Sequence, residues 1–206
     1  TGHDLLQGQG GVDSLHGDAG DDQLVWRIGD SSDLLDGGLD ADVVTVKADS
    51  RNNQINVLQN ATSQLQVSDG SGTITIEDSI TRVVIDAGAG RDAVTIGTVD
   101  RVPTVLLEVN GQGGRDTIDA GGRDLGAVRL LAVGGGGNDT IIGSGADDSL
   151  LGSDGADVVT GEGGDDTLRG GSGKDNLSGG DGDDELFGGD GNDTLLGNDG
   201  RDELDG

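Results

Sequence analysis

Carboxylates recur at a strict spacing in the last third of the chain. Residues 134–205 divide into eight consecutive units of nine residues, each with Gly at position one, Asp at position six and an aliphatic residue at position eight. The position-six residues are Asp139, Asp148, Asp157, Asp166, Asp175, Asp184, Asp193 and Asp202. Asp side chains and the carbonyls of flexible turns offer only oxygen ligands in quantity, which favours a hard cation such as calcium over zinc or copper.

The elements that position these carboxylates follow from the same nine residues. The Gly-rich half of a unit can take positive φ and turn tightly, and the half around position eight is a short strand with one buried side chain. Two units complete one coil, so residues 18 apart should stack at about 4.8 Å. Asp175 is then expected near Asp193, and Asp184 near Asp202. The carboxylates should therefore form two rows, one along each edge of the stack.

Such a stack carries two costs that a cation would offset. Stacked carboxylates repel one another, and a Gly-rich chain loses much backbone entropy on folding. A divalent cation between the turns neutralises the first cost and ties the turns together. We therefore expect calcium binding to be coupled to folding.

The units resemble the repeats-in-toxin (RTX) nonapeptide GGxGxDxUx, and residues 179–187 and 188–196 match it at every defined position. The resemblance implies an all-β fold, a parallel β-roll or β-helix solenoid, with several Ca²⁺ ions bound in the turns by the position-six Asp and by turn carbonyls. Departures from the pattern include Ala146 at position four, and Ser153 and Asn198 at position two. Their turns are expected to bind calcium more weakly.

The same pattern extends the set of candidate ligands towards the N-terminus. Residues 8–16 and 17–25 are good units, and repeat-like turns survive at 87–95 and 111–119. Between them, Trp26 and Arg27 shift the register by two residues, and Trp26 is expected to cover an irregular edge of a coil. Besides the eight Asp residues above, the candidate ligands are Asp4, Asp13, Asp22, Asp42, Asp92 and Asp116, with the turn residues Gly170, Ser172, Gly179, Asp181, Gly188 and Asp190.

Residues 46–133 differ from both flanks, because longer alternating runs rich in β-branched residues predict longer strands. Asp69 to Gly72 predicts a hairpin, and residues 60–62 and 98–103 predict further turns. We predict three sections: calcium β-roll repeats in residues 1–45, a strand-rich section in 46–133 that continues the stack, and an eight-unit calcium β-roll in 134–206. A separate β-sandwich for residues 46–110 is the alternative.

Composition narrows the class of protein. One Trp, one Phe and no Tyr cannot build a large conventional core, and the net charge of −28 excludes nucleic acid as a partner. Intrinsic disorder is the alternative for so acidic a chain, but it would need neither a strict period nor an aliphatic position eight. No apolar run approaches membrane-spanning length, and without Cys the staples must be metal ions.

Calcium sites of extracellular modules work at roughly 0.1 to 1 mM. We therefore expect the folded protein to be secreted or to lie at a cell surface. Catalytic motifs are missing: the sequence has no G-x-S-x-G and no H-E-x-x-H, and the GAGRDA of residues 88–93 leads into β-branched residues where a dinucleotide site needs a helix. No enzymatic activity is expected.

The sequence thus predicts a calcium-binding structural module of a large secreted protein of bacterial type, such as a stalk, adhesin, surface-layer or fibre section. Open ends of the stack would allow self-association. The chain begins and ends inside repeat units, at Thr1 and Gly206, which suggests a piece of a longer array. One alternative is the folding and export module of a type I secreted toxin, protease or lipase. Binding of ice or another surface is a third, disfavoured by the mixed residues at outward positions.

Overall fold

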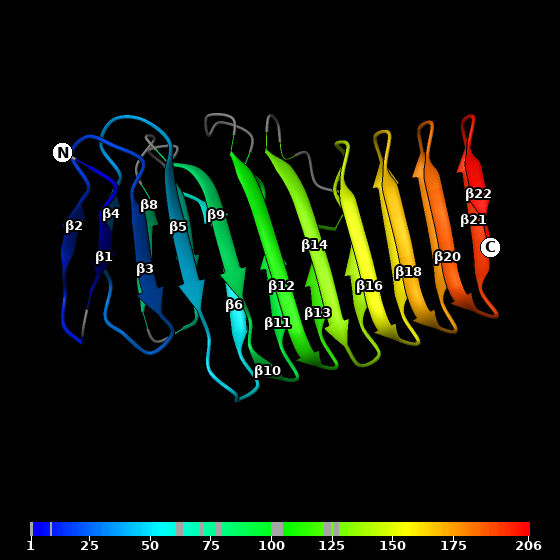
Figure 1. Cartoon of the computed structure of the whole chain (residues 1–206), viewed down its shortest axis with the longest axis horizontal. Helices are drawn as coiled ribbons and strands as arrows, with labels where there is room; N and C mark the ends of the chain where they lie inside the picture. Colours follow the sequence, from blue (N-terminus) through cyan, green and yellow to red (C-terminus); the bar gives the residue numbers. More distant parts are fainter. Residues whose placement is uncertain are drawn as a thin grey trace.

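Two parallel sheets facing each other across one core make up the structure (Figure 1). This computed structural model describes residues 2–8, 10–60, 64–70, 72–76, 80–99, 105–121, 125 and 128–206. Within these ranges the regular elements are 22 strands. The described residues contain no helix that is long and apolar enough to cross a membrane. The described residues do not include Thr1. They also leave out part of the expected turns, namely Ala61, Thr62 and residues 100–103.

The first sheet runs the whole length of the stack, from β1 to β22, with all its neighbouring strands parallel. Among the described residues it comprises β1 (Leu5–Gln7), β3 (Gln23–Arg27), β5 (Asp42–Lys47), β9 (Ile80–Asp86), β10 (Ala89–Gly90), β12 (Leu106–Gly114), β14 (Arg129–Gly136), β16 (Ser149–Gly155), β18 (Thr167–Gly173), β20 (Glu185–Gly191) and β22 (Glu203–Asp205).

The second sheet lies behind the first in Figure 1. Its described strands are β2 (Ser14–His16), β4 (Leu34–Asp36), β6 (Gln54–Gln59), β7 (Leu65–Ser68), β8 (Thr73–Ile76), β11 (Ala93–Ile96), β13 (Thr117–Asp119), β15 (Thr140–Ile142), β17 (Val158–Gly163), β19 (Asn176–Asp181) and β21 (Thr194–Asp199). Its strands are parallel except for β6, β7 and β8, which form an antiparallel meander. The hairpin predicted at Asp69 to Gly72 is thereby confirmed, although Ser71 lies outside the described residues.

The predicted coil of 18 residues is confirmed in the C-terminal part. Leu150 pairs with Leu168, Leu168 with Leu186, and Leu186 with Leu204, all in the first sheet. Consecutive nine-residue units therefore alternate between the two sheets, and each coil adds one strand to each sheet. The all-β class and the parallel solenoid predicted from the repeats are both confirmed.

Coils of the central section are longer than 18 residues but belong to the same two sheets. Equivalent positions lie 24 residues apart between Asp92 and Asp116, and 23 apart between Asp116 and Asp139. The extra length goes partly into β12 and β14, the longest strands of the first sheet at 9 and 8 residues. These strands pair with β9 on one side and with β16 on the other, so the stack passes through residues 80–136 without a break in pairing.

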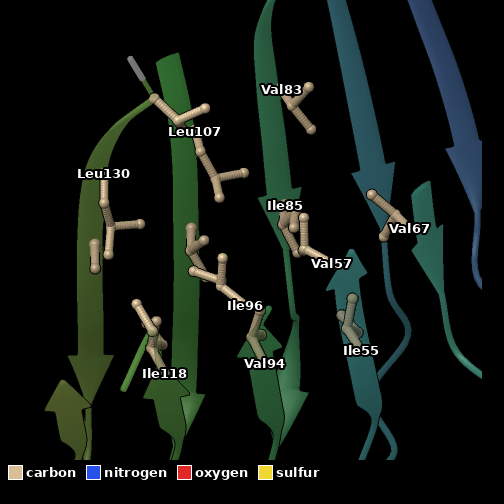
Figure 2. Packing of buried hydrophobic residues seen from close by; sticks show 14 of the residues in the cluster. Ile55, Val57, Val67, Val83, Ile85, Val94, Ile96, Leu107, Ile118 and Leu130 are labelled. Carbon is tan, nitrogen blue, oxygen red and sulfur yellow. The ribbon is translucent and has the colours of Figure 1, made fainter. Parts of the chain in front are cut away.

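The core is a thin layer of aliphatic side chains between the sheets. Figure 2 shows Val83, Leu107 and Leu130 of the first sheet, which share one file of the sheet, together with Ile55 and Val94 of the second, which pair with each other. In the C-terminal units as far as Leu186, the buried apolar residue is the one at position eight. Burying each such side chain contributes about 1.5 to 3 kcal/mol, which is modest per coil, so the stack depends on many coils together.

Trp26 lies in this core, and the expectation that it covers the edge of a coil was wrong. It is 1% exposed, pairs with Val46 in the first sheet and donates its indole N–H to the carbonyl of Ser31 at 3.3 Å. The two residues that shift the repeat register lengthen β3 to five residues and carry the ring into the interior. A large aromatic side chain at this point fills the wider coil beside it.

Glycine at position four is required by the stacking itself. At Gly173 φ is 139°, and a Cβ atom there would overlap the carbonyl of Gly155 in the preceding coil. Position three differs: a Cβ atom at Gly163 would meet nothing closer than 3.7 Å, and φ is not positive there. Two glycines of similar sequence context thus differ in what they tolerate.

We predict that Gly173→Ala destabilises the calcium-loaded protein by at least about 1 to 3 kcal/mol, the usual cost of a non-glycine residue held in a sparsely populated φ region. The overlap with Gly155 adds to this cost. Gly163→Ala is the matched control and should unfold within about 0.5 kcal/mol of the parent chain. Urea unfolding in calcium measures both, and equal midpoints for the two variants would contradict the stacking argument.

Candidate metal centres

The position-six carboxylates line the two edges of the stack. The first row lies at the start of strands of the first sheet and comprises Asp4, Asp22, Asp42, Asp148, Asp166, Asp184 and Asp202. The second row lies at the start of strands of the second sheet and comprises Asp13, Asp33, Asp92, Asp116, Asp139, Asp157, Asp175 and Asp193. Most are fully buried, and those near the ends of the stack are half-buried or, at Asp4, exposed.

Within each row, one oxygen of most carboxylates accepts a backbone N–H from the neighbouring coil. The backbone N–H of Asp166 donates to Oδ1 of Asp184 at 2.9 Å, and that of Asp148 donates to Oδ1 of Asp166 at 2.8 Å. The same bond recurs in the second row, for example from Asp157 to Asp175 at 2.8 Å. Asp175 and Asp193, and Asp184 and Asp202, are joined as the 18-residue coil predicts. The ladder fixes the orientation of each carboxyl group.

The other oxygen of the buried carboxylates is left without a hydrogen bond. Among the described residues, this is Oδ2 of Asp22, Asp33, Asp42, Asp92, Asp116, Asp139, Asp157, Asp166, Asp175 and Asp184, and Oδ1 of Asp148. A buried anionic oxygen without a partner costs several kcal/mol unless a proton or a cation neutralises it. A buried carboxylate oxygen without a hydrogen-bond donor therefore recurs in most of the described turns.

Space beside this oxygen is kept open by the glycine at position one. At Gly161, a Cβ atom would overlap Oδ2 of Asp166 and lie 2.6 Å from the carbonyl oxygen of Gly179 in the next coil. Gly170 shows the same arrangement with Asp175 and the carbonyl of Gly188. Each turn therefore brings a carboxylate oxygen and a carbonyl oxygen from the next coil towards one small space.

Burial raises the pKa of these carboxyl groups. The pKa of Asp166 rises to about 8 because the group is desolvated and because the charges of Asp148 and Asp184 lie close, although the N–H of Asp148 acts in the opposite direction. Burial likewise raises the pKa of Asp116 and Asp157 to about 6. Below its pKa each of these groups holds a proton, and a bound cation would favour the ionised form instead.

The donor set fits calcium. Each turn supplies hard oxygen ligands, anionic from Asp and neutral from carbonyls, and calcium accepts six to eight such ligands in flexible geometry. In the part of the chain that the structure describes, no three carboxylate or imidazole side chains converge on one point. The remaining ligands of an ion would therefore have to be backbone carbonyls, which the tight turns present in number.

The structure places the predicted turn residues in two different environments. Gly170, Gly179 and Gly188, at position one, have their carbonyls beside the open space of the preceding coil. Ser172, Asp181 and Asp190, at position three, are exposed, and the carbonyl of Asp181 accepts the N–H of Gly164 at 2.9 Å. Position three thus takes part in the pairing between coils.

Three residues at the turns were not among the sequence-predicted ligands. Asp33 is 5% exposed, and its Oδ1 accepts the N–H of Asp13 at 2.8 Å, so it belongs to the second row although glycines are missing around it. Ser144 donates its N–H and its hydroxyl to Oδ2 of Asp148, at 2.7 and 2.9 Å. Asn53 occupies position six ahead of β6. The repeat register alone places Asp33 at position six, but its unit lacks glycine at positions one and four, which argued against calcium there.

These features define a class: a parallel β-solenoid whose turns carry buried carboxylates in rows. Comparison with known families agrees, since residues 1–25, 133–168 and 169–204 match the model of the RTX calcium-binding nonapeptide repeat, in four copies. These segments, just under half of the chain, are RTX repeats, and they bind several Ca²⁺ ions in their turns. Comparison with curated proteins found no match. The repeat is a structural calcium-binding module typical of secreted proteins.

The raised pKa values predict how acidity acts on the protein when calcium is removed. A carboxyl group whose pKa is higher in the folded than in the unfolded chain stabilises the fold below the unfolded value, near 4, and this contribution is lost as pH rises through the folded value. For Asp116 and Asp157 that window extends from about pH 4 to about pH 6, and for Asp166 it extends to about pH 8.

We therefore expect the chelated protein to have more β structure at pH 4.5 than at pH 8, and calcium to restore the β signal at pH 8. Circular dichroism at the two pH values, with and without chelator, measures this. A chelated sample with at least as much β structure at pH 8 would contradict the burial of these carboxylates.

Proposed function

We propose that the chain is a calcium-stapled spacer, a stiff section of a large secreted protein such as a stalk, adhesin, surface-layer or fibre protein, without catalytic activity of its own. The observation that carries the proposal is the parallel pairing that runs without interruption through the first sheet, from β1 to β22. A stack in which each coil contacts only its neighbours transmits force along its axis and extends by adding units.

In this proposal the position-six carboxylates are the anionic ligands. The oxygen that lacks a hydrogen bond faces the open space at position one, and the carbonyl of the next coil lies on the far side of that space. A calcium ion bound there would link two consecutive coils. The ligands would be Asp4, Asp13, Asp22, Asp42, Asp92, Asp116, Asp139, Asp148, Asp157, Asp166, Asp175, Asp184, Asp193 and Asp202, with carbonyls that include those of Gly170, Gly179 and Gly188.

Turns differ in how well they suit this role. Turn 143–148 satisfies the carboxylate of Asp148 partly through Ser144, and turn 87–92 has Ala87 at position one, where most turns have Gly. In turns of the consensus type, such as those of Asp166 and Asp184, no protein group donates to one carboxylate oxygen, so only the ion would neutralise it. We therefore place the strongest sites in the C-terminal section.

The outward faces do not favour recognition of ice. Ser149, Thr167, Glu185 and Glu203 form one file of the first sheet, and two adjacent carboxylates break any regular row of hydroxyls. Thr140, Val158 and Asn176 form a mixed file on the second sheet. Self-association through strands at the ends of the stack remains compatible with a fibre and is part of the proposal.

The alternative function, a folding and export module of a type I secreted toxin, protease or lipase, draws on the same buried carboxylates. A chain that stays unfolded at low calcium and folds at high calcium suits passage through a secretion channel. An export module must carry a passenger out of the cell when fused to it, whereas a spacer need not. Secretion of such a fusion from a host with a type I system would favour this alternative.

A rigid spacer predicts a fixed end-to-end distance. The chain contains no Cys, so spin labels can be placed on Gln7→Cys and Glu203→Cys, both exposed, in β1 and β22. Nine inter-strand steps of about 4.8 Å give a span of about 43 Å. Pulsed electron resonance in calcium should give one narrow distance distribution near this value, and a broad distribution in calcium would exclude a spacer.

Removal of a ligand should remove ions from the C-terminal section. Asp184→Ala takes away an anionic oxygen shared with the neighbouring coil, so native mass spectrometry should show one or two fewer bound ions, and the calcium needed for folding should rise at least about tenfold. Asp183→Ala is the matched control, since Asp183 is exposed at position five. An unchanged ion count in Asp184→Ala would overturn the ligand assignment.

The three sections should respond differently to calcium. Residues 46–133 hold most of the aliphatic core and have less negative charge than the flanks, so their strands should depend least on calcium. Hydrogen exchange during a calcium titration reports opening segment by segment. We expect residues 134–206 to lose protection at a higher calcium concentration than the strands that carry Ile85, Val94 and Leu107. Simultaneous loss would mean one cooperative unit.

A further inference from the structure

Asn53 stands at the start of the second row's longest uninterrupted run. It precedes β6 as Asp92 precedes β11, and Gln54 and Ile55 pair with Ala93 and Val94. Its backbone N–H donates to Oδ1 of Asp92 at 2.6 Å, so it makes the same bond along the row as the position-six carboxylates. It is 7% exposed. By position and burial, Asn53 is the neutral counterpart of the row's aspartates.

The side-chain amide of Asn53 is surrounded by oxygen acceptors. Nδ2 lies 2.7 Å from the carbonyl of Arg51, 3.2 Å from that of Ala87, 3.1 Å from Oδ1 of Asp92 and 3.4 Å from the carbonyl of Asp49. Carbonyl and carboxylate oxygens accept hydrogen bonds but cannot donate, so these contacts fix the nitrogen, not the oxygen, at this point. The amide group ties its own turn to the next coil.

The acceptors occupy positions that recur in every coil. Asp49 and Arg51 stand at positions two and four of turn 48–53, and Ala87 stands at position one of the next coil. In the consensus turn of Asp166, the carbonyl at that last position is the one from Gly179 that borders the open space. There the position-six side chain presents an oxygen without a partner, and only a cation can join it to the carbonyls.

We infer that the side-chain amide of Asn53 takes the place of a calcium ion in turn 48–53, so that the long run of the second row begins on a turn that needs no metal. The inference rests on the proposed calcium ligands of the other turns. The Asn53 side-chain nitrogen donates hydrogen bonds to the surrounding oxygens, whereas an Asp carboxylate at the same position offers only acceptors. Arg51 and Asp49 form an exposed ion pair in the same turn, and this pair adds no net charge there.

A partial version of this arrangement occurs where the C-terminal run of the first row begins. Asp148 is the first carboxylate of that run, and Ser144 donates two hydrogen bonds to its Oδ2. The register of β14 with β16 sets Leu130, rather than a carboxylate, beside Asp148 on the preceding coil. In both rows, then, the first carboxyl or carboxamide of the run is bound by groups of the protein itself.

The test is to restore the carboxylate. In the full chain with saturating calcium, Asn53→Asp should bind one more Ca²⁺ ion than the parent chain, counted by native mass spectrometry. Asn52→Asp is the matched control: it makes the same chemical change at the adjacent exposed position, where the side-chain oxygen accepts the N–H of Arg91 at 2.9 Å, and it should leave the count unchanged. An unchanged count in Asn53→Asp, or an equal gain in Asn52→Asp, would overturn the inference.

Hydrogen exchange gives a second, independent measurement. With chelator present, Asn53→Asp should lose protection at the amides of β6 and β11, and calcium should restore it; Asn53→Ala should lose protection there equally with and without calcium. Restoration of Asn53→Ala by calcium would show that an ion already binds in turn 48–53, against the inference. If the parent chain bound no calcium at all, the proposed ligands would fail first, and that result is distinct from an unchanged count in Asn53→Asp alone.

Discussion

The structure depends on a buried carboxyl group with one oxygen satisfied and the other not. One oxygen accepts a backbone N–H from the preceding coil and so sets the register between coils, as between Asp148 and Asp166. The other oxygen faces carbonyls of the next coil and would repel them. The bond that aligns the coils therefore also creates the demand for a cation, and for this reason we expect folding and calcium binding to be coupled.

This constraint explains why the repeat is rich in glycine. Position one must leave space beside the carboxylate, as Gly161 does, and position four must let consecutive coils approach closely, as Gly173 does. Little side-chain volume remains for a core, which is reduced to one aliphatic residue per unit. Such a coil buries too little apolar surface to offset the backbone entropy of its glycines, so the ion supplies what the core lacks.

The sequence predicted those parts of the structure that repeat. Register alone placed Asp175 beside Asp193 and Leu168 beneath Leu186, because a period of nine in a two-strand coil leaves no other arrangement. It did not predict the interior position of Trp26, since a two-residue shift in register indicates an irregularity without saying on which side the ring packs. The roles of Asn53 and Ser144 were also missed, because each depends on which backbone oxygens or carboxylate oxygens meet it from another turn.

The two edges of the stack are not equivalent, and this has a consequence for how its parts are held together. At the first edge, the carboxylates stop at Asp42, which pairs with Ile80, and resume at Asp148. At the second edge, they continue through Asp92 and Asp116 into the C-terminal section. In the proposed arrangement, calcium would join the central coils along the second edge, whereas long apolar strands pack them along the first. Most of the buried aliphatic core also lies in this central section, and the meander of β6, β7 and β8 adds strands to its second sheet. We therefore expect hydrophobic packing to contribute more to stability there, and metal ions to contribute more in the flanking sections.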